Sequence, residues 1–113
     1  MSISETEKID FIGLDPQTSD VILAISDHLD WHESPDEHLL LLQEKLNAYL
    51  RFAESGEVYR HVPLSTSRKI RFRVVGKYPL SDSAKKFYVK AKKSIEDAGF
   101  SLSFEQYEPG SMV

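Results

Sequence analysis

Three of the four histidines lie close together among acidic side chains. Residues 26–46, "SDHLDWHESPDEHLLLLQEKL", contain His28, His32 and His38 together with six carboxylates. Imidazole and carboxylate groups are common ligands of Zn²⁺ when three or four of them converge on the ion. The first chemical hypothesis is therefore a small metal-binding protein that takes its ligands from His28, His32 and His38.

The spacing of these histidines favours a structural role instead. Rings four residues apart, as in His28 and His32, lie close together on one face only in a helix, and Pro35 indicates that the helix starts after them. In an extended segment the two residues would lie about 13 Å apart at ~3.3 Å per residue. We therefore interpret the segment mainly as the start of a helix and keep the metal site as the alternative.

The same segment contains the residue types that begin a helix. Ser34 is predicted to be the N-cap, with Pro35 at the first helical position and Glu37 placed to complete a capping box. The helix is expected to run from Pro35 to about Ser55, with Gly56 in the left-handed conformation that closes helices. Before it, Asp27 and Asp30 are expected to bond loop backbone groups, and Trp31 to cover one end of the core.

Other stretches follow the periodicity of strands and of a second helix. Strands are predicted at 9–14, 21–25, 68–78 and 100–106, and Ser81 is predicted to cap a helix that ends near Ala98. The strand at 21–25 is apolar on both faces, which indicates an interior strand. Strand-helix-strand connections favour right-handed crossovers, so both helices should lie on one face of the sheet. The fold class is α+β, a two-layer β-β-α-β-α-β sandwich with a mixed four-stranded sheet whose order we do not derive.

Length and composition bound the domain count and the compartment. A chain of 113 residues predicts one domain, 1–113, with an ordered core at about 7–107 and a flexible tail at 108–113. The absence of cysteine excludes disulfide and thiolate chemistry. No apolar run approaches the ~20 residues of a membrane span, and the N-terminus lacks a secretion signal, so we expect a cytoplasmic protein.

Signatures of catalysis are missing from the sequence. It contains no nucleophile elbow, no glycine-rich phosphate loop and no H-E-x-x-H motif, and its carboxylates show no spacing typical of an acid–base pair. We therefore expect a protein without catalytic activity and without a cofactor.

The first predicted helix has more apolar positions than one buried stripe needs. The stripe that should face the sheet contains Leu39, Leu42, Leu46, Tyr49, Leu50 and Ala53. Leu41, Ala48 and Phe52 form a second patch that the other helix could cover. Leu40 falls on neither, and with Leu41 and Phe52 it suggests a contact surface for a protein partner or for a second copy of the chain. The polar residues Gln43, Asn47 and Tyr49 are expected to bond neighbouring segments.

The two halves of the chain differ in charge. Residues 1–56 contain 12 acidic and 3 basic side chains, whereas residues 57–113 contain 6 acidic and 11 basic ones. The acidic half suggests an immunity-type protein that occupies the active site of a toxin through Asp27, Asp30, Glu33 and Asp36. Nucleic acid is not an expected partner, because Phe72, Phe100 and Phe104 share parity with the core instead of decorating the open face of the sheet.

The stretches "IDFIGLD", "ISDHLDW" and "EHLLLLQEKLNAYLRFAESG" resemble a family of small bacterial single-domain proteins classed as a domain of unknown function. The resemblance extends from about Ile9 to Phe104 and is densest at 25–56. The family pattern includes Asp27, His28, His38, Gln43, Lys45, Asn47 and Tyr49. His32 lies where the family carries variable acidic residues, which weakens the metal hypothesis, and the resemblance implies no activity.

Overall fold

A mixed four-stranded sheet forms one layer of the protein. The structure is a computed structural model that describes residue 3, residues 5–61 and residues 69–107. The strands are β1 (Phe11–Leu14), β2 (Val21–Asp27), β3 (Ile70–Gly76) and β4 (Ser101–Gln106), in the order β1-β2-β3-β4. β1 pairs antiparallel with β2, and the other two pairs are parallel. The predicted α+β class and the interior position of the strand at 21–25 are confirmed, and the structure supplies the order.

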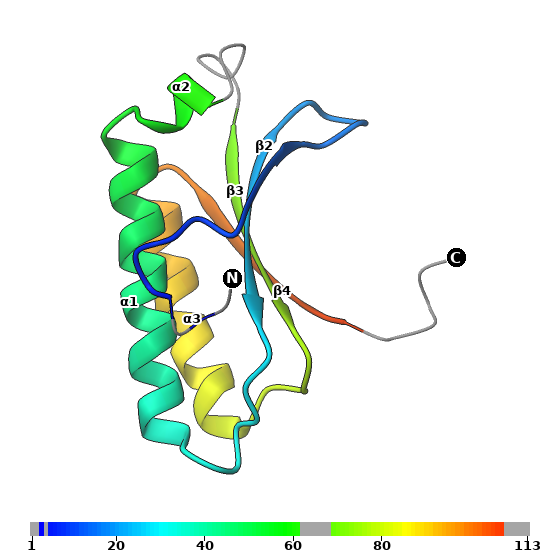
Figure 1. Cartoon of the computed structure of the whole chain (residues 1–113), viewed down its shortest axis with the longest axis vertical. Helices are drawn as coiled ribbons and strands as arrows, with labels where there is room; N and C mark the ends of the chain where they lie inside the picture. The colour runs from blue at the N-terminus through cyan, green and yellow to red at the C-terminus, as the bar shows by residue number, and fades with distance from the viewer. Residues whose placement is uncertain (1–2, 4, 62–68, 108–113) are drawn as a thin grey trace.

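The helices form the second layer. The two long helices, α1 (Pro35–Glu54) and α3 (Asp82–Asp97), lie on the same face of the sheet (Figure 1). A short helix, α2 (Val58–His61), follows α1 and was not predicted. Four residues are too few to show a helical repeat in a sequence, which explains the omission.

The core lies between these layers. Leu23 in β2 pairs in register with Phe72 in β3, and Phe72 pairs with Leu102 in β4; all three are buried. The other sheet face holds Arg71, which contacts Asp15 at 2.5 Å and Asp20 at 3.3 Å. The alternation predicted for these strands is confirmed, because every second residue of β3 is buried in the core and the arginines lie between them on the other face.

The other long helix does not cover the second apolar patch of α1, contrary to the expectation from the sequence. α3 lies against the side of α1 that holds Leu46 and Leu50. On the patch side, residues 5–10, called here the N-terminal segment, run along α1 (Figure 1). The centroid of the Phe52 ring lies 5.3 Å from that of His61 in α2. Ile3, which precedes the predicted start of the core at residue 7, is fully buried.

The two long helices begin differently, although both were predicted to have a serine cap. The Ser81 hydroxyl accepts a hydrogen bond from the Ala84 amide at 3.2 Å, as expected. Ser34 is the N-cap residue of α1, but its side chain makes no cap hydrogen bond, so the predicted capping box is wrong. At the other end, Gly56 has the predicted positive φ, 83°.

Within the described ranges, no helix combines the length and apolar character that a membrane crossing requires. The predicted flexible tail at 108–113 lies outside the described residues.

Candidate functional site

Asp27 and His38 form a buried pair where β2 leads into α1. Nε2 of His38 lies 2.8 Å from Oδ1 and 2.6 Å from Oδ2 of Asp27. The indole of Trp31 stacks on the imidazole, with ring centroids 3.5 Å apart and planes inclined by 17°. All three residues are buried. The predicted role of Asp27 is confirmed, since the Leu29 amide donates to Oδ1 of Asp27. Trp31 belongs to the buried core cluster.

Burial defines the environment of this pair, since His38 is 1% and Asp27 3% exposed. In the neutral imidazole, Nε2 donates to the carboxylate and Nδ1 is left as an acceptor. Nδ1 has no hydrogen-bond partner among the described residues, and neither does the hydroxyl of Tyr88. Burial raises the pKa of Tyr88 far above its ordinary value, and the nearby charge of Asp27 raises it further, so this phenol stays neutral.

The three histidines of the metal hypothesis do not converge. His28 and His32 are exposed, whereas His38 is buried and bonded to Asp27. In residues 5–61 and 69–107, no three His, Asp or Glu side chains have an arrangement that could hold a metal ion. The metal alternative therefore has no geometric support at residues 28–38.

A second buried polar unit ties the N-terminal segment to the middle of α1. The fully buried ammonium group of Lys45 donates to Oδ1 of Asp10 at 2.8 Å and to the carbonyl oxygen of Glu5 at 2.7 Å. Tyr49 donates to the carbonyl oxygen of Ala24 at 2.5 Å and accepts from the amide of Asp10 at 2.8 Å. Burial raises the pKa of Tyr49 well above its ordinary value. Every polar atom of this unit named here has a partner.

Sequence reasoning missed this unit, although a signal was present. Lys45 lies three residues after Leu42 and four before Tyr49, and both of those belong to the stripe predicted to face the sheet. A lysine at such a position must be paired if it is buried. Tyr49 was expected to bond a neighbouring segment, and its bonds to Ala24 and Asp10 confirm this.

The residues predicted to contact a partner separate into buried and exposed groups. Asp27 and Phe52 are buried, so neither can form part of an exposed contact surface, while Leu41 is partly buried. Leu40 is 54% exposed. Asp30 is partly buried and accepts from the amide of His32 at 2.8 Å, whereas Glu33 and Asp36 are exposed.

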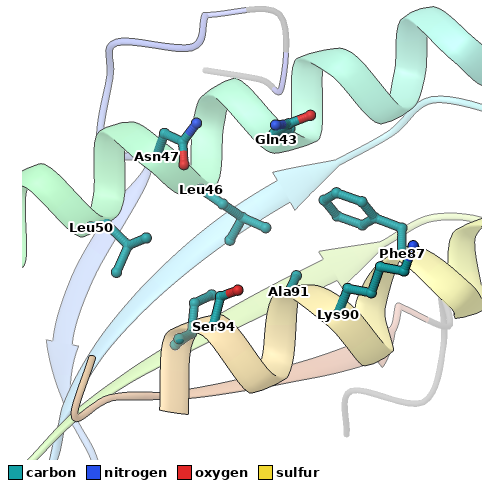
Figure 2. A pocket seen from close by; sticks show the side chains of 9 residues that line it. Gln43, Leu46, Asn47, Leu50, Phe87, Lys90, Ala91 and Ser94 are labelled. Atoms are coloured by element: carbon teal, nitrogen blue, oxygen red, sulfur yellow. The ribbon is translucent and has the colours of Figure 1, made fainter. Parts of the chain in front are cut away.

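A groove lies between α1 and α3 on the side of the helix layer away from the sheet. Leu46 and Leu50 of α1 and Phe87 of α3 point into the space between the helices (Figure 2). Its volume is about 330 Å³, and Gln43 and Asn47 lie along its α1 side. The α3 side contributes Lys90, Ala91, Ser94 and Ile95.

The polar rim of this groove is available to a ligand. Gln43 and Asn47 are exposed, and within the described residues their side chains make no hydrogen bond. Among the described residues, Gln43 and Asn47 therefore do not bond neighbouring segments, contrary to the expectation. Carboxamides both donate and accept, and together with an apolar floor they provide the elements of a binding surface.

Comparison with known proteins identifies the family and no activity. The model of a family of unknown function (DUF6572) matches residues 1–108, so the chain belongs to that family. No curated protein and no solved structure matches the chain. Membership confirms the resemblance that the sequence motifs indicated.

Proposed function

We propose that this member of the family is a non-catalytic protein-binding module whose contact surface is the groove between α1 and α3. The observation that carries the proposal is the contrast between its polar groups. The ionisable side chains that could take part in acid–base chemistry are buried and bonded in pairs, Asp27 with His38 and Asp10 with Lys45. The carboxamides of Gln43 and Asn47, by contrast, line an open groove without partners in the described part of the chain.

The dimensions of the groove favour a protein side chain over a cofactor. Pockets for small molecules span about 300–1,000 Å³ and enclose most of the ligand. At about 330 Å³ this groove lies at the lower end of that range, and it is partly open to solvent. It can accept one apolar anchor residue of a partner, which is how most interfaces concentrate their binding energy.

The rim supports recognition of a polypeptide. Gln43 and Asn47 lie four residues apart, so they face the same side of α1 at the edge of the apolar floor. Each offers an N–H donor and a carbonyl acceptor, the pattern that a peptide backbone requires. Lys90 on the opposite side adds a positive charge that favours binding of an acidic polypeptide segment. We place this function in the cytoplasm, since a chain without cysteine needs no oxidising compartment.

A second candidate is the immunity-type capture of a basic surface by the start of α1. It is favoured by a pocket of about 240 Å³ that Asp30, Glu33, Glu37 and His38 line together with Leu29, Ser34 and Leu41. Because Asp27 is buried, only the exposed acids can serve this role. Replacing Glu33 and Asp36 by lysine should then abolish binding to a basic partner, whereas unchanged binding would eliminate this candidate.

The groove is tested by site-specific photo-crosslinking of the full chain in cells that carry the native gene. A photoreactive residue at Asn47 should form a protein adduct, and the same residue at Lys93, outside the groove, should not. Ser94→Trp places an indole at the exposed rim and should remove the adduct without disturbing the buried core. An Asn47 adduct no stronger than that at Lys93, or one that survives Ser94→Trp, would contradict the proposal.

A further inference from the structure

The outward side of α1 carries a protruding apolar residue beside the groove. Leu40 is 54% exposed. It precedes Gln43 by three residues and Asn47 by seven, so the helical repeat places all three on one side of α1. One surface of the molecule therefore presents both a projection and a depression of apolar character. This is the arrangement that a self-complementary interface needs.

A two-fold axis at the middle of α1 brings these features together. In a symmetric pair each residue i contacts j of the second copy, and j contacts i. When two α1 helices cross antiparallel between residues 43 and 44, Leu40 of one copy lies opposite Asn47 of the other. Leu40 then meets the groove that Asn47 borders, and the same contact forms a second time across the axis.

One pair of exposed charges on α1 agrees with this register. The crossing that pairs Leu40 with Asn47 also places Asp36 opposite Arg51 of the second copy. Asp36 is exposed, and Arg51, 63% exposed in its side chain, contacts the exposed Glu7 at 3.6 Å. Opposite charges therefore meet at both ends of the pair, while Lys90 on the groove rim faces an approaching helix rich in carboxylates.

We propose that the groove is occupied by a second copy of this chain, in a two-fold dimer that packs α1 antiparallel against α1 and inserts Leu40 beside Asn47. This inference rests on the proposed function, because it names the partner of the same groove. The match of projection to groove and of Asp36 to Arg51 carries it.

The first test is the mass of the full chain by sedimentation equilibrium over a wide concentration range. The natural chain should be a dimer, and Leu40→Glu should raise its dissociation constant by about tenfold or more. Val89→Glu is the matched control, because Val89 is 71% exposed on α3 and does not line the groove. A monomeric natural chain overturns the inference, and so does a dimer that Val89→Glu weakens as much as Leu40→Glu. Circular dichroism confirms that each variant is folded.

The register is tested by exchanging the two charges. Asp36→Lys and Arg51→Glu should each weaken the dimer, and the double variant should restore it. Leu40→Cys and Asn47→Cys chains, mixed in a protein that has no cysteine of its own, should form a disulfide-linked pair rapidly. Failure of the double variant to recover, or a pair that links no faster than with Val89→Cys in place of Leu40→Cys, overturns this geometry.

The outcomes also separate this inference from the proposed function. A monomer that still gives an Asn47 adduct with a different protein rejects the dimer and leaves the binding module standing. A monomer that gives no Asn47 adduct rejects both.

Discussion

α1 carries two buried polar units, and they differ in how far along the chain they reach. At the start of the helix, His38 pairs with Asp27, only 11 residues away. In the middle of the helix, Lys45 pairs with Asp10 and with the backbone of Glu5, which are 35 and 40 residues away. The first unit therefore closes one local connection, whereas the second joins the N-terminal segment to the helix layer.

The two units also differ in how completely their polar atoms are satisfied. Lys45, Asp10 and Tyr49 share bonds with one another and with three backbone groups, those of Glu5, Ala24 and Ser26. In the first unit, Nδ1 of His38 has no partner within the described ranges. Buried networks stabilise most when all members are bonded, so the Lys45 unit should be the more sensitive to substitution.

The largest effect is expected from Lys45→Met. This change keeps the apolar stem but leaves the Asp10 carboxylate, 5% exposed in its side chain, without its cation. Removing one member of a buried ion pair destabilises a protein by about 3–5 kcal/mol. Urea denaturation measures the loss, and Lys93→Met on the exposed side of α3 serves as control, with an expected change of at most about 0.5 kcal/mol. Equal losses in the two variants would show that Lys45 is not part of a stabilising pair.

A smaller effect is expected from Asp27→Asn. The amide retains the volume and the acceptor for the Leu29 amide, but it removes the charge that Nε2 of His38 contacts. Hydrogen bonds to charged groups contribute about 1.5–3 kcal/mol, so the free energy of unfolding should fall by that amount. Asp30→Asn, at a partly buried loop position, should have a smaller effect in the same denaturation experiment. If Asp27→Asn proves as damaging as Lys45→Met, the ranking of the two units is wrong.

Alkaline pH should reveal the contribution of the two buried tyrosines to the stability of the fold. Burial raises the pKa of Tyr49 and of Tyr88 above the ordinary value of 10.0, so both phenols are neutral in the folded chain. Their contribution to stability is complete below pH 10 and decreases at higher pH, where only the unfolded chain ionises them. Each should lower the free energy of unfolding by about 1.4 kcal/mol per pH unit above 10.

Phenylalanine variants provide the control for this pH dependence. Tyr49→Phe and Tyr88→Phe should each reduce the slope of stability against pH. At pH 8 they should differ, because the Tyr49 hydroxyl is bonded on two sides and the Tyr88 hydroxyl has no partner in the described chain. Tyr49→Phe should destabilise by about 1 kcal/mol and Tyr88→Phe by almost nothing. An unchanged slope in both variants would show that the buried tyrosines do not cause the pH dependence of stability.

The smallest effects concern the serines that precede the two long helices. Ser81→Ala should reduce stability by about 1 kcal/mol, because it removes the bond to the Ala84 amide. Ser34→Ala should change stability by less than about 0.5 kcal/mol, since Ser34 makes no side-chain cap bond and the Asp27–His38 pair holds the start of α1. Thermal melts of the two variants measure the difference, and a larger loss at Ser34 would reverse this interpretation.

The sequence by itself determined the class of the fold and the position of most elements. Alternation at 70–76, the apolar strand at 21–25 and the helical repeat after Pro35 are local patterns that follow from the geometry of strands and helices. The left-handed Gly56 and the cap at Ser81 were predictable for the same reason, because their chemistry involves only neighbouring residues. The short helix α2 has no such pattern and was not predicted.

Only the tertiary structure decided which polar residues are buried and which face solvent. Lys45 and Asp10 are separated by 35 residues, and no local pattern reports that they meet. The same holds for the side of α1 that α3 covers, which determines that Gln43 and Asn47 border a groove. Contacts between distant segments depend on strand order and helix placement, and these are set by the packing of the whole chain.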